Sequence, residues 1–286
     1  MIHWTEVAVH PAIQRYQLLS QFLKSEHQIE NEVEFLQGPA EQFQELLHKA
    51  MKTSEFVRIG TGFGESVVRE FPFSSERISI LKTADVLLPS GEKWWTRSAT
   101  FHGVQKCLGE ASSGLDTEKK VLIAGAGALS RAVIAALVKM GFKEFNITNY
   151  QEEPVVGLIK DIQKHYFGIK CRYVPMENLI LLSGNHSVLA NTTPYLKENV
   201  LLNELYYLNY LQTGGIVIDF NLNTRDTPLV QEARAVYAKV IEGYQIASWA
   251  DAICSKWTFG VELNREEYNR QLREVIDVCP PIKDPD

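Results

Sequence analysis

Residues 125–130 are the stretch whose residue types and spacing best fit a defined binding chemistry. They read G-A-G-A-L-S, an apolar run at 120–124 precedes them, and an apolar-periodic stretch continues to about residue 140. Gly125 permits a tight turn, Gly127 lets the backbone approach a pyrophosphate, and Ser130 is small enough to keep a helix close to a strand. The helix N-terminus then offers N–H groups and a positive dipole end to the phosphates. We therefore expect a dinucleotide to bind at Gly125, Ala126, Gly127, Ala128, Leu129 and Ser130, although such a turn also occurs in folds that bind nothing.

The elements that position this turn follow an alternating pattern from residue 119 onward. Strands are predicted near 121–124, 145–149, 171–174, 187–190, 215–219 and 238–241. Helical periodicity is predicted between them at about 127–140, 155–166, 200–211 and 227–235. Such alternation is typical of a doubly wound parallel sheet covered by helices on both faces, with ligands at the carboxyl ends of the strands.

The first third of the chain has a different, mixed pattern. Helices are predicted at about 11–25, 39–51 and 101–110, and short strands near 55–60, 78–81, 85–89 and 93–95. We expect an α/β protein with a mixed N-terminal domain over residues 1–104 and a Rossmann-like NAD(P) domain over 105–243. Two helices within 244–286 are expected to pack back on the first domain.

Composition narrows the class of protein. The chain has 286 residues, 45% of them hydrophobic, and a net charge of −6, which argues against a general nucleic-acid surface. No apolar run approaches the ~20 residues that span a bilayer, and the first residues lack the pattern of a signal peptide. The cysteines lack metal-ligand spacing and are expected to be reduced thiols of a cytoplasmic protein without a metal: Cys107, Cys171, Cys254 and Cys279. Nothing in the sequence indicates an oligomeric state.

Four segments resemble the shikimate dehydrogenase family. Residues 125–133 are similar to the family's G-A-G-G-A-[AS]-R-A loop, and residues 191–194, N-T-T-P, to its N-A-T-P segment. Residues 219–229 resemble its D-x-x-Y-N-P-x-x-T-P-L, and residues 257–260 its W-T-G. The matches follow the family's order and spacing. The resemblance implies a substrate domain, an NADP domain, and a small-molecule ligand reduced in the cleft between them.

The same resemblance implies that the usual catalytic pair is absent. The family's lysine, in N-V-T-x-P-x-K, falls on Gly64, and its aspartate, in N-T-D-x-x-G, falls on Thr100. Glycine has no side chain and threonine does not ionise near neutral pH. The family's substrate-binding positions differ too, because a serine pair becomes residues 8–11 (A-V-H-P), an asparagine becomes Asp85 and a glutamine becomes Trp249.

Asp85 and His102 are therefore the candidates for relocated acid/base groups. Asp85 follows a predicted strand and can equally close a turn, and His102 fits a surface or capping role at least as well as a catalytic one. Other titratable side chains of this region are His10, Arg58, Glu65 and Lys82.

The cofactor preference is predicted from the residues after the second strand of the alternating region. The family's N-R-[TS] becomes Asn149, Tyr150 and Gln151, without the arginine that holds a 2′-phosphate, and Glu152 and Glu153 follow. Carboxylates here disfavour a 2′-phosphate, so NAD is favoured over NADP. Asn149 and Tyr150, together with Asn191, Thr192 and Thr193 of the N-T-T-P segment, are the further expected cofactor-binding residues.

Three functions remain open from the sequence. The first is a divergent NAD(P)-dependent oxidoreductase with an altered substrate. The second is a non-catalytic protein of the same fold that binds a nucleotide or another ligand. The third is a genuine shikimate or quinate dehydrogenase.

Overall fold

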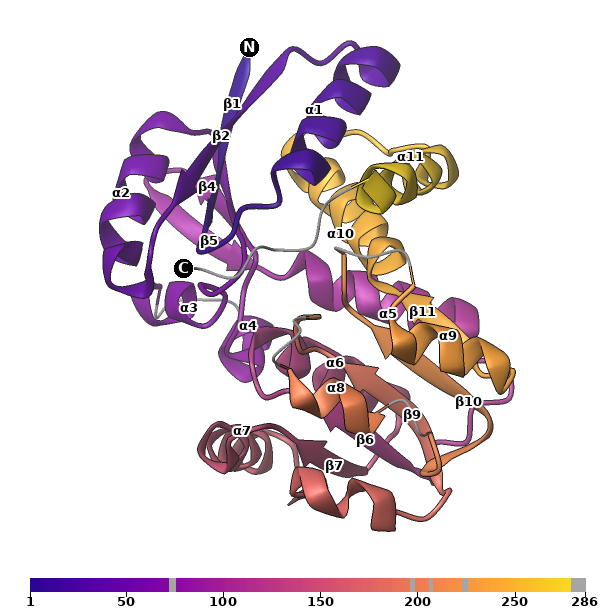
Figure 1. Cartoon of the computed structure of the whole chain (residues 1–286). Helices are drawn as coiled ribbons and strands as arrows, with labels where there is room; N and C mark the ends of the chain where they lie inside the picture. Colours follow the sequence, from indigo (N-terminus) through magenta and orange to yellow (C-terminus); the bar gives the residue numbers. More distant parts are fainter. Residues whose placement is uncertain (72–75, 196–198, 206–207, 223–225, 279–286) are drawn as a thin grey trace. The chain divides into compact units, whose positions relative to one another are not determined.

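The computed structural model describes residues 1–71, 76–195, 199–205, 208–222 and 226–278 (Figure 1). It divides into two compact units. Residues 1–102 and 248–275 form the first unit, and residues 103–247 form the body of the second. Cys279 and the proline-rich end of the chain lie outside the described residues. No helix in the described part of the chain has both the length and the hydropathy needed to cross a membrane.

The first unit contains a mixed five-stranded sheet with the order β2-β1-β3-β4-β5. β1 lies parallel to both β2 and β3, whereas β4 runs antiparallel to its two neighbours, β3 and β5. Gly91, with a φ of +63°, lies in the tight turn between β4 and β5. The strands are β1 (Ile2–Ala8), β2 (Asn31–Gln37), β3 (Phe56–Ile59), β4 (Val86–Ser90) and β5 (Lys93–Arg97).

Helices from both ends of the chain build the core of this unit. Trp4 of β1 stacks on Phe56 of β3 at 5.2 Å, and Phe22 meets Tyr268 edge to face at 5.3 Å. Segments more than 200 residues apart in the sequence therefore share one core. The helices are α1 (Ile13–His27), η1 (Ala40–Gln42), α2 (Phe43–Thr53), α3 (Ser66–Glu70), α4 (Glu76–Leu81), α5 (Ala99–Ala111), α10 (Gly243–Thr258) and α11 (Arg265–Val278), with α5, α10 and α11 each crossing a boundary between the units.

One predicted strand of this unit is wrong. Residues 78–81 belong to helix α4, in which Ile78 and Leu81 are both buried. An i, i+3 spacing places two side chains on one face of a helix, and a four-residue apolar run does not distinguish this pattern from a strand.

The second unit contains a six-stranded parallel sheet with the order β11-β10-β9-β6-β7-β8. Renumbered within the unit, this is the 3-2-1-4-5-6 order of dinucleotide-binding folds, and the winding reverses between β6 and β9. The strands are β6 (Lys120–Ala124), β7 (Glu144–Thr148), β8 (Lys170–Tyr173), β9 (His186–Asn191), β10 (Leu211–Asp219) and β11 (Lys239–Glu242).

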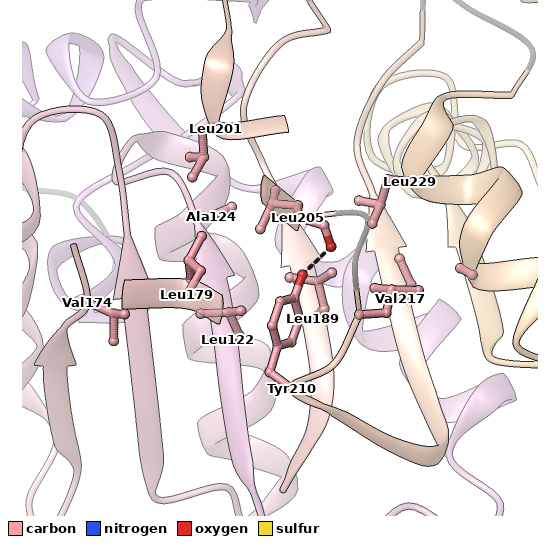
Figure 2. Packing of buried hydrophobic residues seen from close by; sticks show 12 residues of the cluster. Leu122, Ala124, Val174, Leu179, Leu189, Leu201, Leu205, Tyr210, Val217 and Leu229 are labelled. Carbon is pink, nitrogen blue, oxygen red and sulfur yellow. Dashed lines mark hydrogen bonds between the residues drawn. The ribbon is translucent and has the colours of Figure 1, made fainter. Parts of the chain in front are cut away.

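Helices cover both faces of this sheet, since right-handed crossovers on either side of β6 lead to opposite faces. One face packs against a cluster that includes Leu179, Leu201 and Leu229, and Figure 2 shows these side chains converging on Leu122, Leu189 and Val217 of the strands. The buried Tyr210 hydroxyl donates to the carbonyl of Leu205 in the same cluster. The helices of the unit are α6 (Ala128–Met140), α7 (Glu152–His165), η2 (Met176–Leu181), α8 (Val200–Leu205) and α9 (Pro228–Ala235).

The predicted fold class is confirmed: a mixed α/β unit accompanies a Rossmann-like doubly wound unit. The predicted helix over 200–211 is too long, because α8 ends at Leu205 and β10 begins at Leu211. All five tryptophans of the chain lie in the first unit, at Trp4, Trp94, Trp95, Trp249 and Trp257.

Candidate functional site

The glycine turn predicted to bind a dinucleotide lies at the carboxyl end of β6, where the sheet reverses its winding. Gly125 has a φ of +107°, and its N–H donates to the carbonyl of Thr148 at 2.8 Å. A Cβ added at Gly125 would lie 2.2 Å from Thr192 Oγ1. The backbone conformation and this contact therefore both require glycine at position 125.

Gly127 is required by neither the backbone nor a neighbouring side chain. Its φ is −95°, and a Cβ added there would meet nothing within 4 Å. Gly127 is also the N-cap of α6, and no side chain caps this helix end. The first turn of a 13-residue helix thus presents its N–H groups beside an open backbone surface, which is the arrangement that receives a phosphate.

The other predicted residues of the turn flank Gly127. Ala126, Ala128 and Leu129 are half-buried around the open backbone of Gly127. Ser130 is fully buried, and its hydroxyl lies 2.7 Å from Thr192 Oγ1 at the end of β9. The small side chain of Ser130 therefore fastens α6 to the neighbouring strand end.

The N-T-T-P segment lies beside this turn, at the carboxyl ends of β9 and β10. Thr192 donates from its N–H and its hydroxyl to the carbonyl of Ala124, at 2.9 and 2.7 Å. Asn191 accepts from the N–H and hydroxyl of Thr193, at 3.1 and 2.7 Å, and donates to Asp219 Oδ1 at 3.1 Å. The structure thus brings the two predicted halves of the cofactor site together within the second unit.

The end of β7 carries the residues expected at the ribose. Asn149 directly follows β7, and its side-chain amide donates to the carbonyl of Gln151 at 3.0 Å. The side chain of Tyr150 is 73% exposed, so its ring is available to a planar ligand. Glu152 and Glu153 form the exposed first turn of α7.

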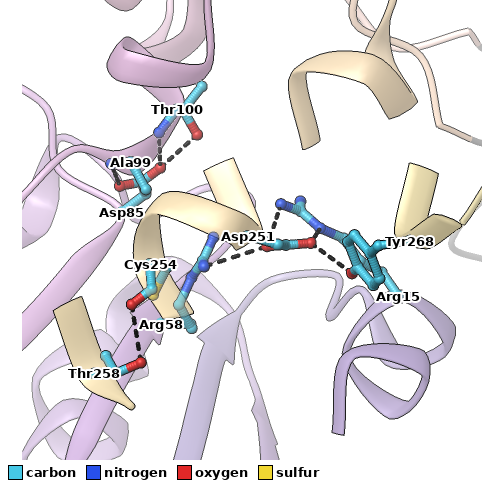
Figure 3. Close-up of polar contacts among 9 residues, drawn as sticks. All are labelled: Arg15, Arg58, Asp85, Ala99, Thr100, Asp251, Cys254, Thr258 and Tyr268. Carbon is cyan, nitrogen blue, oxygen red and sulfur yellow. Dashed lines mark hydrogen bonds and ion pairs between the residues drawn. The ribbon is translucent and has the colours of Figure 1, made fainter. Parts of the chain in front are cut away.

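Asp85, in the first unit, caps helix α5 (Figure 3). Its carboxylate accepts from the backbone N–H of Ala99 at 2.6 Å, from that of Thr100 at 2.7 Å, and from the Thr100 hydroxyl. Ser98 also accepts from the N–H of Phe101 at 3.2 Å. Asp85 therefore occupies a helix N-terminus, where a negative charge is stabilised. A carboxylate offers about four lone pairs, so these three donors leave one unused.

The segment 82–85 touches both positions where the resemblance predicts the catalytic pair to be lost. The N–H of Ala84 donates to the carbonyl of the buried Gly64 at 2.9 Å, and Asp85 binds Thr100. Lys82 begins this segment in the left-handed region, with a φ of +56°. Lys82 is thus two residues from the contact with Gly64, and Asp85 itself makes the contact with Thr100.

His102 packs against an aromatic ring. Its own ring meets Trp257 edge to face at 5.7 Å, and Arg97 lies 4.9 Å from the same indole on α10. Trp249, also on α10, has the guanidinium of Arg265 at 4.4 Å. The predicted candidates Asp85 and His102 therefore lie in the first unit, and the predicted cofactor residues lie in the second.

A buried cluster of charges in the first unit was not predicted from the sequence (Figure 3). Asp251 on α10 is fully buried and accepts from Arg15 at 2.7 and 2.8 Å, from Arg58 at 3.3 Å and from the Tyr268 hydroxyl at 2.8 Å. Burial raises the pKa of Tyr268 well above its usual range. Arg15 and Asp251 are 236 residues apart in the chain, so no local pattern pairs them.

Glu6 lies close to this cluster, as the cross-strand partner of Arg58. It is 1% exposed and accepts from the N–H of Ala12 at 2.8 Å. Burial raises the pKa of Glu6 to about 7, against the opposing effects of the Ala12 hydrogen bond and the charges of Arg15 and Arg58. A Cβ at Gly60 would lie 2.4 Å from Glu6 Oε1, which requires glycine where the chain leaves β3.

Within the residues that the structure covers, no group of three histidine, cysteine or carboxylate side chains is placed to hold a metal ion. Of the segment 219–229 that resembles a family motif, residues 223–225 lie outside the described residues.

Comparisons with known proteins place this geometry in a class. No protein-family model matches the chain. The shikimate dehydrogenase (NADP(+)) of Caldicellulosiruptor saccharolyticus is 25% identical over 241 residues, which cover 79% of this chain and 84% of that protein. The enzyme of the same name from Methanosarcina acetivorans is 28% identical over 174 residues, which cover 61% of this chain and 61% of that protein.

Solved structures of similar fold match almost the whole chain. Shikimate 5-dehydrogenase from Thermus thermophilus, in complex with NADP(H) and shikimate, has a TM-score of 0.77 at 18% identity, over 96% of this chain and all of that one. Quinate dehydrogenase from Corynebacterium glutamicum, in complex with NAD, has a TM-score of 0.78 at 14% identity, over 96% of this chain and 98% of that one.

The class that the fold and the site define is therefore a two-unit protein with a dinucleotide-type second unit. Within this class, the curated relatives and solved structures described above carry the names shikimate dehydrogenase and quinate dehydrogenase, at 14–28% identity to this chain.

Proposed function

We propose that this chain is a nicotinamide-dependent oxidoreductase of the shikimate dehydrogenase type, with NAD as the favoured cofactor and an altered substrate. The observation that carries the proposal is the open backbone at Gly127 above the uncapped N-terminus of α6. The solved structures of similar fold include complexes with NADP(H) and with NAD, which supports a nicotinamide cofactor here.

The residues of the second unit fit such a cofactor. The turn from Gly125 to Ser130 would hold the pyrophosphate on the N–H groups of α6, and Asn149 and Tyr150 would hold the adenosine half. The segment 191–193 would border the nicotinamide half. When bound, the cofactor supplies the hydride acceptor or donor of the reaction.

Three side chains after β7 favour NAD over NADP. Tyr150 stands where the resemblance predicts an arginine, and the carboxylates of Glu152 and Glu153 lie in the first turn of α7. A 2′-phosphate would meet two like charges and no predicted guanidinium.

We assign the acid/base chemistry to the segment 82–85 of the first unit. The unused lone pair of Asp85 would accept a proton from a substrate hydroxyl, and Thr100 and the α5 N-terminus hold that carboxylate in one orientation. Lys82 would supply the cation at the position that Gly64 leaves without a side chain. A site built on Asp85 and Lys82 would differ in shape from one built on side chains at positions 64 and 100, and we therefore propose a substrate other than shikimate.

The names of the curated relatives favour a second candidate, a genuine shikimate dehydrogenase, and the solved quinate dehydrogenase widens this candidate to quinate. The two candidates share the cofactor site and differ in the substrate that the first unit accepts.

A glycine substitution tests the cofactor site directly. Gly127→Ala places a methyl group where the pyrophosphate would approach, and we expect it to weaken NADH binding in calorimetric titration by about tenfold or more. Alanine is a poorer N-cap than glycine, so we expect a stability loss of only ~0.5 kcal/mol.

Gly157→Ala is the matched control. Gly157 lies within α7, and a Cβ there also meets nothing within 4 Å. This variant should bind NADH like the wild type. Equal NADH affinity in the wild type and Gly127→Ala would refute the proposed phosphate position, and no binding of NADH or NADPH to the wild type would refute the oxidoreductase.

A substrate panel separates the two candidates. NAD(H)- and NADP(H)-linked turnover would be measured with shikimate, quinate and a set of other hydroxy acids. Turnover of another hydroxy acid that is lost in Asp85→Asn supports the altered substrate. Efficient shikimate oxidation with NADP would instead establish the second candidate.

A further inference from the structure

Asp219, at the carboxyl end of β10, is the centre of a buried hydrogen-bond network in the second unit. It is 2% exposed, and its Oδ1 accepts from the side-chain amides of Asn191 at 3.1 Å and Asn221 at 2.6 Å. Its Oδ2 accepts from the hydroxyl of Thr227 at 2.5 Å. Burial raises the pKa of Asp219, and these hydrogen bonds oppose that shift.

An ionised carboxylate accepts hydrogen bonds and donates none, so a neighbouring side-chain amide must face it with the NH2 group and not with the oxygen. Asn191 and Asn221 must direct their NH2 groups at Asp219, and their oxygens therefore point the other way. The Asn191 oxygen accepts from the N–H and hydroxyl of Thr193, and the Asn221 oxygen accepts from the N–H of Tyr195 at 2.7 Å. Asp219 thus fixes both ends of residues 193–195 without touching them.

The anchored segment continues directly from Thr192, whose hydroxyl binds Ser130 of the glycine turn and the carbonyl of Ala124. It lies at the carboxyl ends of β9 and β10, on the far side of the winding reversal from β7 and β8. In folds of this order the two halves of a dinucleotide lie on the two sides of that reversal. β6–β8 serve the adenosine half, so residues 192–195 serve the nicotinamide half.

We propose that Asp219 is a positioning residue for the nicotinamide half of the cofactor. By accepting hydrogen bonds only, it fixes the amides of Asn191 and Asn221 and holds residues 193–195 in the geometry that receives this half. The proposal rests on the nicotinamide cofactor proposed above. Asp219 itself does not contact the cofactor.

Asp219→Asn tests the polarity of the network with almost no change of volume. The new amide can donate as well as accept, so Asn191 and Asn221 are free to turn and release the N–H groups of Thr193 and Tyr195. Calorimetric titration would compare NADH with ADP-ribose, which contains the adenosine half and lacks nicotinamide. We expect NADH to bind about tenfold more weakly, and ADP-ribose to stay within about twofold of the wild type. Hydrogen exchange at Thr193 and Tyr195 should become faster.

Thr227→Val is the control variant. Thr227 binds the other oxygen of Asp219 and caps α9 by accepting from the N–H of Val230 at 3.3 Å. This variant should lower stability yet leave the NADH to ADP-ribose ratio unchanged, because both amides keep their acceptor. A ratio that shifts equally in both variants would show a merely structural role and overturn the proposal.

The outcomes also separate this proposal from the proposed function. If the wild type bound NADH and ADP-ribose with the same affinity, the positioning role would be refuted. A wild type that binds neither ligand would refute the cofactor itself, and with it the role of Asp219. Unchanged NADH affinity and unchanged exchange at Thr193 and Tyr195 in Asp219→Asn would overturn the proposal while the cofactor stands.

Discussion

At the scale of single residues, Glu6 has the environment that most alters the chemistry of its side chain. Its carboxyl is buried between the Ala12 N–H and the backbone of Gly60, and its pKa is raised to about 7. The folded chain therefore holds a proton on Glu6 that the unfolded chain releases near pH 4.5. For a raised pKa, the stabilisation is complete below the unfolded value and is lost as the pH rises through the folded one.

The raised pKa of Glu6 predicts how the stability of Glu6→Gln depends on pH. The wild type and the variant should unfold alike at about pH 4.5, and the variant should be more stable at about pH 8, by an amount on the order of 3 kcal/mol. Urea unfolding at several pH values measures the difference between the two free energies of unfolding. Glu34→Gln, at an exposed position of β2, is the control, and a Glu6→Gln difference that is independent of pH would contradict the prediction.

The residues of the glycine turn could be predicted because their chemistry is local. A strand, a turn with two glycines and a helix follow one another within about 20 residues of sequence. The structure added the physical reason for the separate roles that the sequence predicts for the two glycines. Gly125 is required by its own backbone and by Thr192, whereas Gly127 faces open space.

At the scale of elements, α5 depends on a cap from outside its own sequence. Asp85 binds the first N–H groups of the helix from the start of β4, 14 residues before Ala99. The local signal at the start of this helix is Ser98, which directly precedes Ala99. The sequence therefore left the role of Asp85 open between a turn and a catalytic group.

Asp85→Asn should destabilise the first unit by about 1 kcal/mol, because an amide accepts fewer hydrogen bonds and carries no charge for the helix dipole. Thr100→Val removes one of the three donors to Asp85 and should cost less. Thermal unfolding of both variants measures the effect. Identical melting temperatures for Asp85→Asn and the wild type would show that the cap contributes no stability.

The sequence predicted the strands of the second sheet better than those of the first. The six strands of the second sheet were all predicted, and β6, β9 and β10 contain the continuous apolar runs of parallel strands that are buried on both faces. β1 and β2 were not predicted. β1 buries the polar Thr5 and Glu6 in mid-strand, which breaks its apolar run, and β2 alternates Glu32 and Glu34 with Val33 and Phe35 over only a few residues.

At the scale of the whole molecule, the first unit is assembled from two distant segments of the chain, and Asp251 joins them through a buried set of charge-assisted hydrogen bonds. It pairs with Arg15 of α1 and Arg58 of β3, and it accepts from Tyr268 of α11. Such a contact depends on the complete fold, so the sequence alone could not pair these charges.

Asp251→Asn removes the buried carboxylate with which Arg15 and Arg58 pair, and should destabilise the first unit by roughly 3–5 kcal/mol. Tryptophan fluorescence follows this unfolding selectively, because the second unit has no tryptophan. Glu34→Gln breaks the exposed pair with Lys49 in the same unit, at 2.9 Å, and should cost no more than ~1 kcal/mol. Equal losses in the two variants would show that burial does not set the strength of these pairs.

The discontinuous first unit has a consequence for the order of events during synthesis. A nascent chain that has reached residue 247 already contains every strand of both sheets, yet it still lacks Asp251 and Tyr268. Arg15 and Arg58 were made among the first 60 residues and have no buried anion from α10 to meet. Domains generally fold from the N-terminus as they leave the ribosome. Here every strand of the second unit has been made while the unit that is begun first still waits for most of α10 and for α11.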